Sequence, residues 1–383
     1  MRGSGPIMRT ATFVATAVLS LSGAASATSQ PQAPRADLPT AADAFVSARV
    51  AADSFSGAVL VARNGKIEYQ RAVGLADRER GLAMQLSTQV QIASTTKLFT
   101  QIAIRQLEQA GKLSLADTVG KFLPDYPNPI VRSRVTVEQL LRHRSGVGSF
   151  WNEKFRERAP HLRSVRDYME LFQDDSLLFE PGTGEAYSNG GYVLLGAIIE
   201  QVSGMSYHDY LGERVFRVAG MTETVPYDSR VTRAHAAIGY TGQMPGAPMT
   251  GDRRLAGAGP RPGGERRMPG GGPRRPNTGI QPGMSGPAGD HYSTVGDFLK
   301  LADALLGHRL LDSARTEALL GARYAAGQDF RANGGGPGTN AEFSIFPGGE
   351  VIVVLSNYDP PSGTVVAQHL RSLIAPPTPT VPH

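Results

Sequence analysis

Alternating apolar and polar positions predict a β-hairpin near each end of the chain. Residues 57–74 alternate around Asn64 and Gly65, and this dipeptide is the strongest two-residue signal for a hairpin turn. Residues 342–346 and 350–355 repeat the alternation on either side of a Pro-Gly-Gly turn. The two predicted strand pairs are therefore separated by most of the chain.

Helical spacing of apolar residues surrounds these hairpins and fills the middle of the chain. A period of 3.6 residues covers residues 40–52, with Thr40 as the expected N-cap, and residues 364–374. The central segments with the same period are residues 94–109, 137–141, 192–202 and 295–306. The pattern predicts an α/β fold in which an antiparallel sheet, built from both ends, is flanked by terminal helices and carries an inserted mainly helical domain.

The first residues have the pattern of a targeting segment. Arg2 and Arg9 precede an apolar run over residues 11–21, and small residues follow up to Ala27. This pattern predicts a cleaved signal peptide at 1–27, hence a periplasmic or secreted protein. The apolar run is too short to span a bilayer, which takes about 20 residues, so no stable membrane anchor is expected. A linker over 28–39 and a Pro-rich tail over 376–383 complete the expected organisation around a domain at 40–375.

The formal net charge of +5 is concentrated in one segment. Residues 242–288 are rich in Gly and Pro and carry seven arginines against Asp252 and Glu265. A site for nucleic acid would place aromatic side chains among the arginines to stack on bases, and this segment has none. We therefore predict a flexible surface insertion and no nucleic-acid partner.

Several classes of site are excluded by the residue inventory. The chain has no cysteine, which excludes disulfides, thiolate nucleophiles and iron–sulfur clusters. Its eight histidines are scattered without a zinc-hydrolase spacing, so no metal is expected, and His143 is assigned a local structural role. No cofactor is expected either, because no Gly-rich phosphate loop follows a predicted strand.

The first candidate chemistry is the sequence from Ser94 to Lys97, which opens a predicted helix. The i, i+3 spacing places the hydroxyl and the amine on one face of that helix. A serine becomes nucleophilic when a neighbouring base accepts its proton, and a lysine buried at a helix start can serve as that base. On its own, S-x-x-K is better explained by a capping serine followed by a solvated lysine.

A second element downstream changes this balance. Tyr187 and Asn189 form a Tyr-x-Asn sequence directly before a predicted helix. Together with Ser94 and Lys97, this pattern resembles the serine penicillin-recognising hydrolases, which are related to the serine β-lactamases. Within that superfamily it is most similar to the branch of class C β-lactamases, D-alanyl-D-alanine peptidases and family VIII carboxylesterases. The resemblance extends over roughly residues 41–357, apart from the insertion, and implies a β-lactamase/transpeptidase-like fold.

The resemblance also implies roles for individual residues. Ser94 would be the nucleophile that forms an acyl-enzyme, Lys97 the base, and Tyr187 the relay that protonates the leaving group. Asn189 would hold Lys97 and the substrate, and the backbone N–H groups of Ser94 and Gly335 would stabilise the oxyanion. The implied substrates are small molecules: a short-chain ester, a D-amino-acid peptide or a β-lactam. The residues leave the choice among these three open.

One element departs from the family pattern. Relatives carry Lys-Thr-Gly or His-x-Gly on the strand beside the nucleophile, whereas this chain has Ala332, Asn333 and Gly334 there. Asn333 is the candidate for the substrate-binding role but carries no charge. The sequence therefore keeps an alternative open, namely a catalytically impaired member that binds peptidoglycan-like or other ligands without turnover.

Overall fold

The computed structural model describes residues 37–231, 233–242 and 273–374. The predicted signal peptide, most of the predicted linker, the Pro-rich tail and residues 243–272 of the predicted insertion lie outside these ranges. Among the helices in the described ranges, none has both the length and the apolar character that crossing a bilayer requires.

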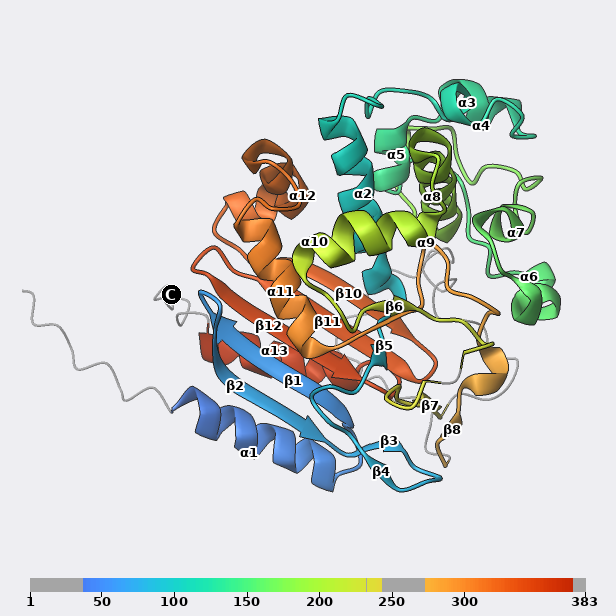
Figure 1. Ribbon diagram of the computed structural model, residues 1–383. Coiled ribbons are helices and arrows are strands. Elements are labelled where there is room, and N and C mark those ends of the chain that lie inside the picture. Colours follow the sequence, from blue (N-terminus) through green and yellow to red (C-terminus); the bar gives the residue numbers. More distant parts are fainter. Residues whose placement is uncertain (1–36, 232, 243–272, 375–383) are drawn as a thin grey trace, which may run out of the picture. The chain divides into compact units, whose positions relative to one another are not determined.

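A five-stranded antiparallel sheet joins the two ends of the domain, in the order β10-β11-β12-β1-β2 (Figure 1). Its strands are β1 (Gly57–Arg63), β2 (Lys66–Val73), β10 (Phe330–Gly336), β11 (Thr339–Ile345) and β12 (Glu350–Ser356). Both predicted hairpins are confirmed. Asn64 and Gly65 both have positive φ, 49° and 76°, as a two-residue hairpin turn of type I′ demands. β1 pairs with β12, so strands from the two ends of the domain lie side by side in one sheet.

The terminal helices α1 (Leu38–Ala51) and α13 (Ser362–Ile374) cover one face of the sheet. Alternate strand residues, such as Val59 on β1 and Val354 on β12, form a core with them. The predicted N-cap is wrong: α1 begins at Leu38, with Asp37 at the N-cap. The Thr40 hydroxyl donates a hydrogen bond to the Asp37 carboxylate and is already in the first turn.

The opposite face of the sheet carries α11 (Val295–Leu306) and the helical region, which confirms the predicted fold class. Leu60 and Val353 belong to this second, larger core. Its remaining helices are α2 (Lys97–Gln109), α3 (Val119–Phe122), α4 (Pro129–Arg134), α5 (Val137–Leu141), α6 (Glu153–Arg158), α7 (Val165–Met169), α8 (Asn189–Ser203), α9 (Tyr207–Tyr210), α10 (Arg217–Ala219) and α12 (Ser313–Ala325).

Short elements connect these layers. The short helical turns are η1 (Ala93–Thr96), η2 (Ala159–His161), the π-helical η3 (Leu211–Phe216) and η5 (Thr278–Ile280). The short strands are β3 (Leu75–Asp77), β4 (Leu82–Ala83), β5 (Val90–Gln91), β6 (Val225–Pro226), β7 (Tyr240–Thr241), β8 (Arg275–Pro276) and β9 (His291–Ser293). The helix predicted over 94–109 is divided between two of these elements: η1 contains Ser94, and α2 begins at Lys97.

Residues 273–288 depart from the predicted surface insertion, because they pack into the domain. The Asn277 side-chain amide is buried and donates a hydrogen bond of 2.9 Å to the carbonyl of Pro337, at the turn between β10 and β11. Ala288 is also buried, and β8 pairs with β7. Gly and Pro in this stretch therefore serve close backbone packing, which their frequency alone could not distinguish from a solvated loop.

Candidate active site

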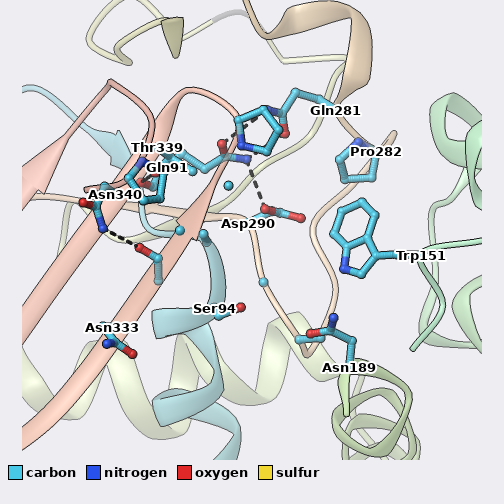
Figure 2. A pocket seen from close by; sticks show the side chains of 18 of the residues that line it. Gln91, Ser94, Trp151, Asn189, Gln281, Pro282, Asp290, Asn333, Thr339 and Asn340 are labelled. Carbon is cyan, nitrogen blue, oxygen red and sulfur yellow. Dashed lines mark hydrogen bonds between the residues drawn. The ribbon is translucent and has the colours of Figure 1, made fainter. Parts of the chain in front are cut away.

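A cavity of about 360 Å³ lies where η1, the strand β10 and the loop before α8 meet (Figure 2). This volume is typical of sites for small molecules. The residues lining it include five of the six predicted site residues: Ser94, Tyr187, Asn189, Asn333 and Gly335. The sixth, Lys97, reaches the same place through its hydrogen bonds.

Ser94 is held at the start of η1 by an unusual backbone turn. The chain leaves β5 and Ala93 takes a φ of 43°, which is uncommon and costly for a residue with a Cβ. Ser94 is part-buried while Ala93 and Thr95 on either side are buried. The turn therefore directs one hydroxyl into the cavity while its neighbours are packed.

Lys97 is buried, with 5% of its surface exposed, and its amine has three acceptors. Nζ lies 3.2 Å from the Ser94 Oγ, 2.8 Å from the Asn189 Oδ1 and 2.5 Å from the Ala288 carbonyl oxygen. The predicted Ser–Lys pair thus forms across one turn. The two further acceptors come from distant segments and hold the amine at the hydroxyl.

Asn189 is positioned by the N-terminus of α8. The Ser188 side chain caps this helix by accepting a hydrogen bond from the N–H of Gly191, at 2.7 Å. The Asn189 amide nitrogen donates to the Ser149 hydroxyl at 3.1 Å, which leaves its oxygen for Lys97. Ser149 was not among the predicted residues. It comes from a loop whose sequence has no catalytic spacing.

Tyr187 lines the cavity and is 40% exposed. The Lys97 Nζ lies over its ring, 4.8 Å from the ring centroid, in a cation–π contact. Among the hydrogen bonds of the described residues, none joins the Tyr187 hydroxyl to Lys97. The structure therefore brings Tyr187 to the site, but it is the ring of Tyr187 that contacts Lys97. The predicted relay role requires the hydroxyl instead.

His143 supports this part of the site from behind. Its Nδ1 accepts a hydrogen bond of 3.1 Å from the N–H of Ser188, and its ring lies 4.7 Å from that of Tyr187. Burial, assisted by the charge of Lys97, lowers the pKa of His143 to about 4, so the imidazole is neutral at pH 7. His143 thus has a local structural role, which is to hold the Tyr-x-Asn segment through Ser188 and Tyr187. A lone histidine in the sequence could not show this.

Glycine on β10 allows this strand to approach the nucleophile. A Cβ on Gly334 would lie 2.2 Å from the carbonyl oxygen of Ile92 and 2.9 Å from the backbone nitrogen of Ser94, both impossibly close. Gly336 pairs with Thr339 across a two-residue turn. The preceding residue, Gly335, is therefore in a non-hydrogen-bonded pair and directs its N–H away from β11. β10 is the edge strand and Gly335 lines the cavity, which leaves this N–H available as the second oxyanion donor.

The family pattern's basic residue is absent at Ala332, Asn333 and Gly334, and the one arginine of β10, Arg331, pairs with Asp329 outside the cavity lining. Ala332 shares a strand face with Gly334 and packs against the larger core. Asn333 is exposed and lies on the other face of the strand. No lysine, arginine or histidine is among the described residues that line the cavity. Asn333 therefore borders the cavity without facing the nucleophile.

Sequence analysis missed an acid in the cavity, Asp290. Gln91 donates a hydrogen bond to its carboxylate at 3.3 Å. Desolvation raises the pKa of Asp290 to about 6, against the opposing charge of Lys97. A single aspartate in a loop carries no sequence signal, because only the fold brings it to Ser94.

Comparison with known proteins agrees with this geometry. The sequence model of the family described as Beta-lactamase matches residues 42–374. Penicillin-binding protein 4* of Bacillus subtilis (strain 168) is 36% identical over 192 residues, which are 49% of this chain and 42% of that protein. The chain thus aligns with less than half the length of this relative.

Two solved structures have the same fold. The crystal structure of a penicillin-binding protein from Bacillus halodurans is 27% identical, with a TM-score of 0.71, and the match covers 88% of this chain and 99% of that one. D-amino acid amidase from Ochrobactrum anthropi SV3, complexed with D-phenylalanine, has a TM-score of 0.69 over the same shares of the two chains. Its identity of 22% shows a common fold alone.

Proposed function

The chain belongs to the beta-lactamase family, and we propose that it is a serine hydrolase that forms an acyl-enzyme on Ser94 and acts on esters or amides. One observation carries the proposal: a buried lysine amine lies 3.2 Å from the Ser94 hydroxyl and is fixed by two acceptors from other segments. A solvated lysine beside a capping serine would have neither the burial nor the partners.

The proposed reaction begins with transfer of the Ser94 proton to the amine form of Lys97 as Oγ bonds to the substrate carbonyl carbon. The carbonyl oxygen becomes an oxyanion, which the N–H groups of Ser94 and Gly335 stabilise. The bond to the leaving group then breaks, and the leaving oxygen or nitrogen takes a proton through Tyr187. A water molecule attacks the resulting ester and releases Ser94.

Tyr187 must rotate for this relay, because its ring now lies against the Lys97 amine. The side chain is 40% exposed, so rotation meets little packing. Catalytic hydrogen bonds are often absent before substrate binds and form in the complex. The relay role of Tyr187 is therefore part of the proposal.

The proposed substrates lack a carboxylate near the scissile bond. No described residue lining the cavity is cationic, and Asp290 adds a negative charge to it. A charge-assisted hydrogen bond is roughly twice as strong as a neutral one, so penicillins and D-alanyl peptides lose more here than plain esters do. We propose that turnover of short-chain esters exceeds turnover of penicillins.

The binding alternative has its own supporting observation, the small apolar Ala332 in place of a basic residue. Loss of that cation reduces transition-state stabilisation by an amount on the order of 2–4 kcal/mol, which slows a reaction without abolishing it. The Ser94–Lys97–Asn189 arrangement is intact, and for this reason the hydrolase is the better proposal.

Export is a further part of the proposal, and it stands on the sequence pattern of residues 1–27 alone. N-terminal sequencing of the protein secreted from an expression host tests it. A mature chain that begins just after Ala27 is expected, and an uncleaved chain retained in the cytoplasm would refute export.

The test of catalysis is covalent labelling. Purified protein is incubated with a fluorescent fluorophosphonate and, separately, with p-nitrophenyl acetate. We expect labelling at Ser94, identified by peptide mass spectrometry, and ester hydrolysis that Ser94→Ala removes. Ser133→Ala is the matched control, because Ser133 is exposed on α4 and its hydroxyl bonds only to the carbonyl of Pro129. Activity that survives in Ser94→Ala would refute the assignment. Binding of a fluorescent penicillin without labelling or turnover would support the binding alternative.

A further inference from the structure

Two acids line the cavity, and only one of them has a cationic partner. The Glu342 carboxylate accepts a hydrogen bond from the Arg371 guanidinium at 2.8 Å and from the Thr364 hydroxyl at 2.7 Å. Within the described residues, no lysine, arginine or histidine forms an ion pair with Asp290. Its one side-chain hydrogen bond comes from the neutral amide of Gln91. Asp290 is therefore the acid with an unbalanced charge.

The backbone places Asp290 beside the nucleophile. Its N–H donates to the carbonyl of Ala93 at 3.3 Å, and two residues earlier the Ala288 carbonyl accepts from Lys97. Asp290 has a φ of 76°, a conformation that aspartate tolerates at some cost. The segment from Ala288 to Asp290 thus runs along η1 and delivers a carboxylate to the cavity that holds Ser94.

The groups around Asp290 leave its charge directed at the cavity. Among the described residues, Lys97 is the one cation whose charge acts on Asp290 appreciably, and its amine already has three acceptors. The other ionisable neighbours of Asp290 are Tyr168, Tyr227 and Tyr292. Burial raises the pKa of each of these hydroxyls, so they are neutral at pH 7. In Figure 2 the carboxylate is directed toward the side of the cavity formed by Trp151 and Pro282. An aromatic ring near a carboxylate suits an organic cation.

We infer that Asp290 is the specificity-determining residue of the site and selects esters or amides whose acyl part carries a positively charged amine near the scissile carbonyl. This inference rests on the proposed function. An ammonium group would supply the charge that Asp290 lacks, and it could stack on Trp151 while the carbonyl carbon lies at Ser94. A carboxylate at the same position would meet Asp290 with no described cation lining the cavity.

The experiment compares two substrates of one shape. Alanine methyl ester, as each enantiomer, and methyl isobutyrate differ by an ammonium in place of a methyl group, and hydrolysis of both is followed at pH 7 by pH-stat. We expect kcat/KM for one alanine enantiomer to exceed that for methyl isobutyrate. Asp290→Asn should lower this ratio at least about tenfold, as expected for loss of a hydrogen bond between charged groups. Asparagine keeps the shape and tolerates the positive φ.

Asp174→Asn is the matched control, since it makes the same change on the exposed surface and should leave the ratio as it is. An equal loss of both activities in Asp290→Asn would show a structural role and overturn the inference. The wild-type ratio tests it without any variant: a preference for methyl isobutyrate over both alanine enantiomers would also overturn it.

A binding measurement separates this inference from the proposed function. Calorimetry compares alaninamide with isobutyramide on the Ser94→Ala protein, with and without Asp290→Asn. Tighter binding of alaninamide that depends on Asp290 would support the inference even if no ester were hydrolysed, in which case only the proposed function fails. Hydrolysis of methyl isobutyrate together with equal binding of the two amides would leave the proposed function standing and refute the inference.

Discussion

The two walls of the cavity are built in different ways. On the helical wall, the polar groups are side chains. Lys97 and Asn189 are buried, hydrogen-bonded to each other and held by further hydrogen-bond partners. On the sheet wall, the backbone of β10 approaches Ser94 closely and Asn333 adds no charge, while Ala332 of the same strand packs against the larger core. The proposed base and its hydrogen-bond partner thus lie on the helical wall, and the close backbone approach lies on the sheet wall.

This separation explains how specificity can change while catalysis is kept. Removing Lys97 or Asn189 would leave the other buried polar group without one of its hydrogen-bond partners, which costs free energy of folding. Side chains on the sheet wall can vary as long as glycine permits the close approach at Gly334. In this chain the strand adds no charge to the cavity lining, and the loop contributes the acid Asp290.

The largest effect is expected on the helical wall. Lys97→Ala removes the base and leaves Asn189 without its donor, so ester hydrolysis should fall on the order of a thousandfold or more, about as far as in Ser94→Ala. Lys121→Ala, which breaks an exposed ion pair with Asp117, is the control and should hydrolyse p-nitrophenyl acetate normally. A Lys97→Ala protein with near-normal kcat would contradict the comparison.

A methyl group on the sheet wall should have the next largest effect. Gly334→Ala would force a Cβ into the backbone of Ile92 and Ser94, so kcat/KM for the ester should fall about a hundredfold as the oxyanion donors shift. In Gly336→Ala the added Cβ meets only the Thr339 side chain, at 3.7 Å, an ordinary contact. Equal activity of the two variants would show that β10 does not approach Ser94 as described.

Charge on the sheet wall should alter selectivity rather than ester chemistry. Ala332→Lys places a cation on the strand face of Gly334, and acylation by benzylpenicillin should rise about tenfold relative to ester hydrolysis. Asn333→Lys places the same charge on the other face and should change the ratio much less. Stopped-flow measurement of penicillin acylation decides between them. A larger gain from Asn333→Lys would reverse the assignment of the two faces.

The smallest expected effect depends on pH. Asp290 binds an ammonium only as a carboxylate, and its pKa is raised to about 6. The ratio of alanine methyl ester to methyl isobutyrate turnover should therefore be full at pH 7 and about tenfold lower at pH 5, as the acid protonates. Taking the ratio cancels the pH dependence of every step that the two substrates share. In Asp290→Asn the ratio should be flat, and a flat wild-type profile would argue against Asp290.

Local pattern was sufficient to predict the sheet and terminal helices of the protein and to single out a candidate nucleophile. The hairpin at Asn64-Gly65 and the terminal helices follow from periodicity and turn chemistry, which act over a few residues. The pairing of Ser94 with Lys97 is local as well, because the residues lie one turn apart. Some helix starts differed from the pattern: α1 begins at Leu38 instead of Thr40, and α8 at Asn189 instead of Tyr192. The helix predicted over 94–109 is divided into η1 and α2.

The tertiary structure alone decided how the cavity is charged and which groups face it. The ring contact of Tyr187, the packing of residues 273–288 and the arrival of Asp290 beside Ser94 depend on segments far apart in the sequence. The strand register decided that Ala332 and not Asn333 shares the face of Gly334. A register shift of one residue exchanges the two faces without changing any local pattern. For this reason the sequence by itself predicted the candidate catalytic residues, whereas only the tertiary structure decided which groups face the cavity beside them.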